Sequence, residues 1–301
     1  MELSDALVAA VKAAGSAVVR VDGRRHGSAS GVVGSPDGTI VTAAHGLDGD
    51  DEVEVGLASG DTAGARVVGR DGSTDVAVIR IEAGALPAPA WSDAALEVGQ
   101  LVLSVTRPGR GPKAALGLVS RLGDAWRTAS GGKVDRWVEL DLALHPGFSG
   151  GLVLDLAGRG VGIATAGLAR GTPLALPVAT LRRVVKSILA HGGVRRGYLG
   201  IATLPAGLSA QLANQIGRRS ALLVTAVEED SPAGRAGLAV GDLLLSVDGT
   251  AVAELGDLLP LLEEERIGDV TRAQVARGGA LHEVQLTIGV RGARGEGSCR
   301  P

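Results

Sequence analysis

Three residues of this chain have side chains that can together perform nucleophilic catalysis: His45, Asp75 and Ser149. A serine hydroxyl becomes a strong nucleophile when an imidazole removes its proton. A carboxylate then fixes the tautomer of that imidazole and stabilises the imidazolium. The three residues follow one another in the order His, Asp, Ser, which is one of the orders known for this triad. The sequence therefore predicts a catalytic site assembled from three distant segments.

Ser149 lies in a glycine-rich turn with the sequence HPGFSGG, residues 145–151. Glycines permit a sharp turn and leave the neighbouring amides uncovered. We expect the backbone N–H groups of Gly147 and Ser149 to form an oxyanion hole, assisted by the Phe148 amide in the resting geometry. Such donors stabilise the oxyanion that forms when a carbonyl is attacked. The turn therefore predicts acyl-transfer chemistry.

The other two residues stand at the ends of predicted strands. Residues 40–45 (IVTAAH) form a β-branched strand that runs into a small-residue turn presenting His45. Residues 74–81 place Asp75 at the mouth of an apolar strand. Asp71 competes with Asp75, but we interpret it as a turn residue.

The remaining four histidines are weaker candidates for the base. His145 is close to Ser149 in sequence, but the intervening Pro-Gly turn is expected to aim it away. The other three are assigned to a polar loop, a helix end and a late strand or turn: His26, His191 and His282.

Composition restricts the class of protein. A chain of 301 residues favours two domains, and an aromatic fraction of 2% predicts cores built from aliphatic side chains. A net charge of −3 argues against nucleic acid as a partner. We expect no cofactor and no metal, because the chain has neither a Walker-type phosphate loop nor a His/Cys cluster. The single cysteine, Cys299, can form no internal disulfide.

No secretory leader and no transmembrane segment is expected. The N-terminal apolar run is interrupted by Lys12, and no run approaches the roughly 20 apolar residues that span a bilayer. This predicts a cytoplasmic protein if Met1 is the natural start, and a cell-envelope or periplasmic protein if the chain is trimmed.

The catalytic segments are embedded in a mostly β pattern. From Ser16 to about Ala175, short β-branched runs are broken by Gly, Asp and Ser, which favours two six-stranded barrels. Apolar residues at helical spacing predict helices at Leu3–Ala13, with Ser4 as N-cap, and at Thr180–Ala190.

Six segments carry a family resemblance: Gly27–Leu47, Ala65–Ile81, Leu140–Gly151, Leu176–Leu189, Arg195–Ile201 and Ser231–Val252. Together they resemble the HtrA/Deg family of trypsin-like serine proteases with a C-terminal PDZ domain. The resemblance implies a double β-barrel of the chymotrypsin type followed by an α+β PDZ domain. The expected parts are an N-terminal helical segment (1–15), the protease domain (16–192), a hinge (193–197), the PDZ domain (198–290) and a disordered tail (291–301).

The resemblance also implies an activity and partners. It describes an ATP-independent endopeptidase that cleaves unfolded or damaged proteins, while the PDZ domain binds peptide C-termini. It implies a homotrimer, whose N-terminal contact would be aliphatic because residues 3–17 contain no aromatic side chain. The family usually has Asn where this chain has Phe148. The alternative is therefore a proteolytically weak or inactive PDZ-containing chaperone or peptide-binding adaptor.

Specificity for the P1 residue depends on the base of its pocket, which is the residue six positions before the serine. A trypsin-like preference for Lys or Arg needs a carboxylate there. That residue is Ala143, so a basic P1 side chain would be buried without a partner. We expect small or medium aliphatic P1 residues. The predicted pocket is walled by Ala143, Leu144, Ile163, Ala164, Thr165 and Ala166.

In the second domain, Tyr198, Leu199, Gly200 and Ile201 resemble the carboxylate-binding loop of PDZ domains, which a peptide extends as an added strand. The leucines Leu258, Leu261 and Leu262 either line the groove or pack in the core.

Residues 123–136 are our candidate sensor loop. Phe148 cannot accept the ion pair of a cleavage-activated zymogen, so control by ordering a loop is expected instead. The alternative is an ordinary exposed hairpin.

Overall fold

The computed structural model describes residues 3–23, 28–47, 49, 51–82, 85–169 and 171–291. The chain divides into two compact units, residues 1–194 and residues 195–301. The predictions for His26, for Cys299 and for the tail beyond Arg291 lie outside the described residues.

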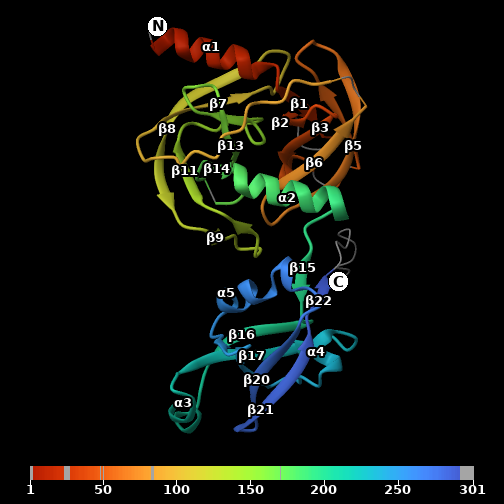
Figure 1. The fold of residues 1–301 in the computed structure, drawn as a ribbon, viewed down its shortest axis with the longest axis vertical. Coiled ribbons are helices and arrows are strands. Elements are labelled where there is room, and N and C mark those ends of the chain that lie inside the picture. The colour runs from red at the N-terminus through yellow and green to blue at the C-terminus, as the bar shows by residue number, and fades with distance from the viewer. Residues whose placement is uncertain are drawn as a thin grey trace. The chain divides into compact units, whose positions relative to one another are not determined.

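The first unit contains two closed six-stranded antiparallel barrels, which confirms the predicted architecture (Figure 1). The first barrel, in the order β1-β2-β3-β6-β5-β4, consists of β1 (Val18–Asp22), β2 (Ser28–Ser35), β3 (Thr39–Ala43), β4 (Glu52–Gly56), β5 (Thr62–Asp71) and β6 (Val76–Ile81). The second, in the order β11-β14-β13-β12-β7-β8, consists of β7 (Leu101–Thr106), β8 (Lys113–Gly123), β11 (Trp137–Asp141), β12 (Leu152–Leu154), β13 (Gly160–Thr165) and β14 (Leu174–Pro177).

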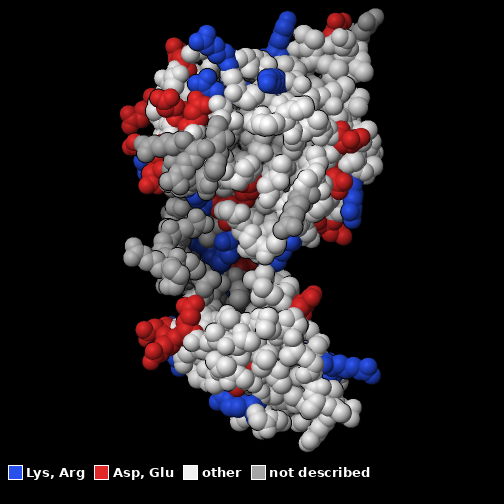
Figure 2. Space-filling model, turned by 180° about the vertical axis from the view of Figure 1, so that it is seen from behind, with Lys and Arg blue, Asp and Glu red and all other residues white. Residues whose placement is uncertain are grey.

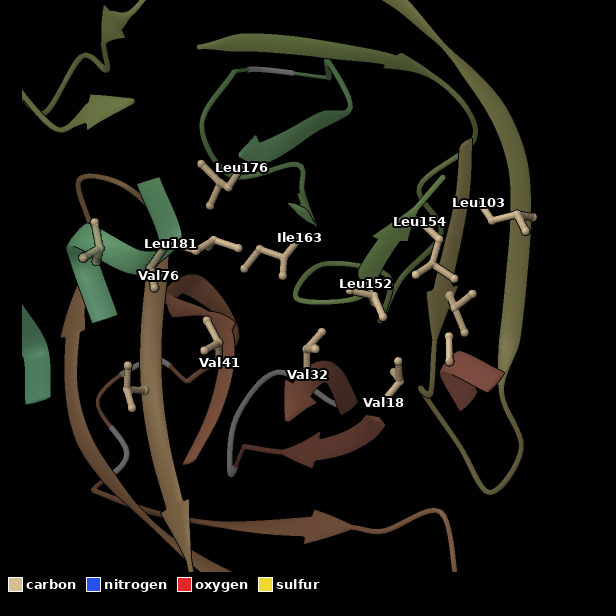
Figure 3. Packing of buried hydrophobic residues seen from close by; sticks show 14 of the residues in the cluster. Val18, Val32, Val41, Val76, Leu103, Leu152, Leu154, Ile163, Leu176 and Leu181 are labelled. Atoms are coloured by element: carbon tan, nitrogen blue, oxygen red, sulfur yellow. The ribbon is translucent and has the colours of Figure 1, made fainter. Parts of the chain in front are cut away.

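Strand alternation gives the first unit three apolar clusters. Side chains on one face of a strand fill its own barrel, and on strands that face the other barrel, such as β1, β2 and β3, those on the opposite face pack between the barrels. Neighbouring residues therefore belong to different clusters: Val19 lies inside the first barrel, whereas Val18 lies between the two. Figure 3 shows the cluster between the barrels, where Val32 and Val41 from one barrel point toward Leu152 and Ile163 from the other. This shared core fixes the two barrels against each other.

Two helices complete the first unit. Helix α1 (Leu3–Gly15) is longer than predicted and already contains Ser4, so Ser4 is not its N-cap. Helix α2 (Val178–His191) ends where Gly192 adopts a left-handed φ of 73°, and its buried face joins the core between the barrels. A short hairpin, β9 (Trp126–Arg127) and β10 (Lys133–Val134), lies within the predicted sensor loop.

The second unit is an α+β domain. Its main sheet has the order β16-β17-β18-β20-β21, with β19 paired to β18, and a second sheet pairs β15 with β22. The strands are β15 (Arg196–Tyr198), β16 (Ile201–Gly207), β17 (Ser220–Val227), β18 (Leu243–Val247), β19 (Thr250–Ala251), β20 (Val270–Arg277), β21 (Ala280–Thr287) and β22 (Gly289–Arg291). The helices are α3 (Ala210–Ile216), α4 (Pro232–Arg235) and α5 (Leu255–Leu258), followed by the 3₁₀ turns η2 (Leu259–Leu262) and η3 (Glu264–Arg266).

Two predicted boundaries require correction. Arg196 and Gly197, which we assigned to the hinge, belong to β15, where they pair with Arg291 and Val290 of β22. The same pairing places Arg291 in the second unit rather than in the tail. Backbone pairing between the two ends of the domain explains both differences.

Charged side chains are scattered over the face of the molecule shown in Figure 2. Basic and acidic side chains lie there in small separate groups with wide uncharged areas between them. This agrees with the small net charge of −3. Within the described residues, no helix is long and apolar enough to cross a bilayer.

Candidate active site

His45 and Asp75 are brought together by the pairing of two strands. His45 lies in the 3₁₀ turn η1 (Ala44–Gly46) directly after β3, and Asp75 directly precedes β6. These strands run antiparallel with Ala43 opposite Val76, so the end of one strand lies beside the start of the other. The Ala44 N–H donates to the Asp75 carbonyl at 3.1 Å and closes this edge.

The imidazole of His45 is anchored on the Asp75 carboxylate. Nδ1 lies 2.9 Å from Oδ1 and 2.8 Å from Oδ2, and the His45 backbone N–H donates to Oδ1 at 3.0 Å. Asp75 is 3% exposed, whereas the His45 side chain is 48% exposed. One ring nitrogen is therefore held in the interior while the other side of the ring remains open to a substrate.

The carboxylate raises the pKa of the His45 imidazole above its ordinary value of 6.5, because its hydrogen bond stabilises the protonated ring. Partial burial of His45 opposes this effect without cancelling it. The ring is thus prepared to accept and hold a proton.

Thr165 is a third member of this cluster that sequence reasoning placed elsewhere. Its hydroxyl donates to Asp75 Oδ2, while the Gly167 N–H donates to Thr165 Oγ1 at 3.0 Å. We predicted Thr165 as a wall of the specificity pocket, which is wrong for its hydroxyl. The signal was present in the alternation of β13, which turns Thr165 and Ile163 toward the first barrel.

The segment before Ser149 forms a tight turn. The Phe148 N–H donates to the His145 carbonyl at 3.0 Å, and Gly147 has a φ of +85°. With Pro146 at the second position, this is the pattern of a type II turn, which requires a positive φ at the third position. The Phe148 amide is therefore occupied and does not serve as an oxyanion donor, contrary to our expectation.

The amides of Gly147 and Ser149 remain as candidates. Neither donates a hydrogen bond to another group within the described part of the chain. Two free N–H groups on the same turn are the donors that an oxyanion hole needs.

The segment that carries Ser149 contacts both barrels. In the second barrel, the Gly150 N–H donates to the Ala164 carbonyl at 2.8 Å, next to Thr165. In the first, the Ser149 carbonyl accepts from Ser30 N–H at 3.2 Å. A Cβ on Gly150 would lie 3.0 Å from the backbone nitrogen of Ala43. The turn that carries Ser149 thus lies where the two barrels meet, close to the end of β3 that leads into His45.

No hydrogen bond joins the Ser149 hydroxyl to His45 among the described residues, so that contact belongs to the proposed mechanism. His145 is turned to a different partner, as we expected. Its ring packs edge-on against the buried ring of Phe148, with the centroids 5.5 Å apart at 74°.

Asp71 is the last residue of β5 rather than a turn residue, as we had interpreted it, and its side chain binds the turn that follows. Its buried carboxylate accepts from the Ser73 hydroxyl at 2.8 Å and from the Thr74 hydroxyl at 2.7 Å. It stabilises the turn that presents Asp75.

The residues that we predicted as walls of the specificity pocket differ in their burial. Ile163 is fully buried in the core between the barrels, so its inclusion in the pocket is wrong. Ala164 is fully buried in the core of the second barrel, at whose edge Leu144 packs. Ala143 and Ala166 are exposed.

In the second unit, β16 is an edge strand of the main sheet, and α5 contacts it. An edge strand offers unpaired backbone groups to an added peptide strand. The N–H groups of Leu199 and Gly200 donate to no acceptor within the described residues. Gly200 has a φ of +81°, and the Tyr198 hydroxyl donates to Glu228.

Helix α5 and the 3₁₀ turn η2 direct Leu258 and Leu262 into the core of the second unit. Leu258 is 3% exposed and Leu262 is 9% exposed, and both belong to the domain core. Leu261 packs against the same core. These observations favour the core-packing interpretation for Leu258 and Leu262.

Two family models match this architecture. Residues 29–163 match the trypsin-like peptidase domain, and residues 197–288 match the PDZ domain. A probable periplasmic serine endoprotease DegP-like from Pseudomonas savastanoi pv. phaseolicola is 34% identical over 86% of this chain and 55% of its own length. The chloroplastic protease Do-like 1 from Arabidopsis thaliana is 34% identical over 87% of this chain and 63% of its own length.

Solved structures of HtrA-type proteases have the same fold over nearly the whole chain. The HtrA-type protease AlgW with decapeptide has a TM-score of 0.76 at 26% identity and covers 97% of this chain and 99% of that one. The chain belongs to the HtrA family. The serine endoprotease from Yersinia pestis has a TM-score of 0.75 at 27% identity, covering 97% of this HtrA chain and 98% of its own. This chain spans 55% and 63% of the length of these two curated relatives.

No group of three or more metal-binding side chains is present among the described residues of this HtrA chain.

Proposed function

We propose that this chain is a serine endopeptidase in which Ser149 attacks the scissile carbonyl of a polypeptide. His45 takes the Ser149 proton and then delivers it to the leaving amine, which leaves an acyl-enzyme. Water, deprotonated by His45, hydrolyses that ester and releases the second product. Asp75 holds the ring throughout, and Thr165 holds the Asp75 carboxylate. The observation that carries the proposal is the buried Asp75 carboxylate bound to His45 Nδ1.

The oxyanion of each tetrahedral intermediate is assigned to the Gly147 and Ser149 N–H groups. The type II turn aims these groups before substrate arrives, so little reorganisation is needed during the reaction. Phe148 supports this turn from within the protein, since its side chain is 3% exposed.

The decisive experiment labels the intact chain with a fluorophosphonate probe and follows casein cleavage. We expect Ser149 to be labelled, and Ser149→Ala to abolish both labelling and cleavage. Cleavage retained by Ser149→Ala contradicts the assignment. A folded wild-type chain that neither labels nor cleaves would favour the adaptor alternative, which the comparisons do not support.

We assign unfolded or damaged polypeptides as substrates, cleaved after small or medium aliphatic residues. Neither Ala143 nor Leu144 offers a charge to a basic P1 side chain. A library of peptides that differ only at P1 tests this preference. Faster cleavage after Lys or Arg than after Val or Ala contradicts it.

The PDZ domain is assigned the capture of peptide C-termini on the edge of β16, with the terminal carboxylate on the Leu199 and Gly200 amides. Titration with a peptide and its C-terminal amide separates this mode from general strand addition. The amide should bind much more weakly. Equal affinities contradict carboxylate recognition.

We also propose that the chain forms a homotrimer and acts in the cell envelope. Leu3 and Val8 of α1 are 53% and 50% exposed and offer an aliphatic contact for a homotrimer, which light scattering would measure directly. The cell envelope is the proposed compartment, because relatives are named periplasmic proteases. Fractionation of cells that express the native gene tests this.

A further inference from the structure

Ser30 on β2 is joined to the turn that carries the nucleophile by two hydrogen bonds. Its backbone N–H donates to the Ser149 carbonyl at 3.2 Å, and its hydroxyl donates to the Gly147 carbonyl at 2.7 Å. Ser30 is 0% exposed, so water does not compete for these bonds. One residue of the first barrel thus holds the carbonyls on both sides of Phe148.

Among the described residues, the Ser30 hydroxyl donates its hydrogen to the Gly147 carbonyl. The Arg107 backbone N–H donates to Ser30 Oγ at 2.9 Å, which uses an oxygen lone pair and leaves the single hydrogen for the Gly147 carbonyl. The next amide, Phe148 N–H, is held by the His145 carbonyl. The Gly147–Phe148 peptide is therefore fixed at both its oxygen and its nitrogen.

This peptide controls the direction of the Gly147 N–H. Gly147 can adopt many backbone conformations, and its φ of +85° is one that only glycine reaches easily. With the following peptide fixed, the remaining freedom lies in the Pro146–Gly147 peptide, which carries one of the two proposed oxyanion donors. Releasing the Gly147 carbonyl would allow that donor to turn away.

Arg107 is itself firmly anchored. Its guanidinium donates to the Val18 carbonyl at 2.7 Å, to the Arg110 carbonyl at 2.8 Å and to the Gly15 carbonyl at 2.6 Å. The residue is 5% exposed, and no carboxylate lies within ion-pair distance among the described residues. Gly15 ends helix α1, where backbone carbonyls lack helical partners. The side chain therefore holds the Arg107 backbone in place.

We propose that Ser30 is a positioning residue for the oxyanion hole and that Arg107 fixes the orientation of its hydroxyl. The inference rests on the proposed peptidase function and extends it to a residue that touches no reacting atom. Loss of the Ser30 hydroxyl should weaken stabilisation of the tetrahedral intermediate while leaving binding of the substrate ground state unchanged.

A second buried serine supplies a matched control. Ser104 on β7 is also 0% exposed, but its hydroxyl has no hydrogen-bond partner among the described residues. Ser104→Ala removes the same atom from the same kind of environment without touching the turn. It should leave kcat and KM unchanged.

The experiment uses the full chain as wild type, Ser30→Ala, Ser30→Thr and Ser104→Ala. For each, kcat and KM are measured on one peptide substrate, together with inhibition by a peptide boronic acid and by the matching cleavage product. The boronic acid forms a tetrahedral adduct on the serine, whereas the product binds without one. Circular dichroism and thermal unfolding establish folding.

We expect Ser30→Ala to lower kcat by about tenfold to hundredfold, since complete loss of an oxyanion donor costs about 10²–10³. The affinity for the boronic acid should fall in parallel, whereas KM and product affinity should stay near wild type. Ser30→Thr, which keeps the hydroxyl, should recover most of kcat.

Wild-type kcat in folded Ser30→Ala overturns the inference, as does an equal loss of product affinity and boronic acid affinity. Should Ser30→Ala not fold, Arg107→Lys is measured instead, because lysine keeps the cation but cannot reach three carbonyls as a fork. Wild-type kcat in Arg107→Lys then overturns the inference. An inactive, unlabelled wild-type chain would instead refute the proposed peptidase function itself.

Discussion

The hydroxyl of Thr165 donates to the Asp75 carboxylate that also binds His45, and it joins the second barrel to the catalytic pair of the first. Because the Gly167 N–H already donates to Thr165 Oγ1, the hydroxyl hydrogen is directed to the carboxylate. Two residues from different barrels are thus locked in one orientation. Ser30 joins the barrels in a similar way, through its hydrogen bonds to the turn that carries Ser149.

Thr165→Val should lower kcat/KM by about tenfold to hundredfold, because a hydrogen bond to a charged group contributes about 1.5–3 kcal/mol. Steady-state kinetics on a peptide substrate measures the change. Thr165→Ser keeps the hydroxyl and should remain close to wild type. Similar losses in both variants would show that the methyl group, rather than the hydroxyl, is required.

The pH dependence of the reaction should follow His45. The Asp75 carboxylate raises the pKa of this imidazole, so kcat/KM should rise with pH through a midpoint above 6.5, as the ring loses its proton and becomes a base. Asp75→Asn removes the stabilisation of the protonated ring. Its midpoint should move to lower pH, and its plateau should fall by about 10⁴. An unchanged midpoint in Asp75→Asn contradicts this account.

Gly167 leaves room for the catalytic pair. A Cβ at this position would lie 2.8 Å from both Asp75 Oδ2 and His45 Nδ1, which is too close for ordinary contact. Gly167→Ala should displace the pair and lower kcat/KM by about a hundredfold without unfolding the protein. Gly64→Ala is the control, because nothing lies within 4 Å of its added carbon. Equal activity of the two variants would refute the close packing.

The sequence predicted the barrels correctly, and it singled out the three proposed triad residues, because each of these predictions rests on a local pattern. Strand alternation marks the barrels, and small-residue or glycine turns mark the ends where His45, Asp75 and Ser149 stand. The roles of Thr165 and Ser30 depend on contacts between barrels, which no local pattern reveals. Phe148 shows the same limit, because its amide is engaged through a turn whose type depends on the Gly147 φ.

The hairpin of β9 and β10 holds the turn that presents Asp75. The Thr128 hydroxyl donates to the Ser73 carbonyl at 2.8 Å and accepts from the Gly132 N–H at 3.0 Å. Thr128 is 6% exposed, so Thr128→Val would remove both of these shielded hydrogen bonds, each of which contributes about 0.5–1.5 kcal/mol. We expect kcat to fall more than KM rises.

This variant separates the two interpretations of residues 123–136. A sensor loop that positions Asp75 predicts lower kcat in a folded protein, and an ordinary hairpin predicts lower thermal stability alone. Ser130→Ala, at an exposed position of the same loop, is the control and should change neither quantity. Wild-type kcat in Thr128→Val would exclude the sensor interpretation.

The final prediction concerns α5, whose two ends differ in burial. Leu258 is 3% exposed in the core of the second unit, whereas Leu255 on the same helix is 51% exposed. Leu258→Ala should destabilise this unit by about 2–5 kcal/mol, since it removes a buried side chain and leaves a cavity. Leu255→Ala should change stability by less than about 0.5 kcal/mol. Denaturant unfolding of the full chain measures both, and peptide titration shows whether either residue contributes to the groove. Wild-type stability with weakened peptide binding in Leu258→Ala would instead show that Leu258 lines the peptide-binding groove.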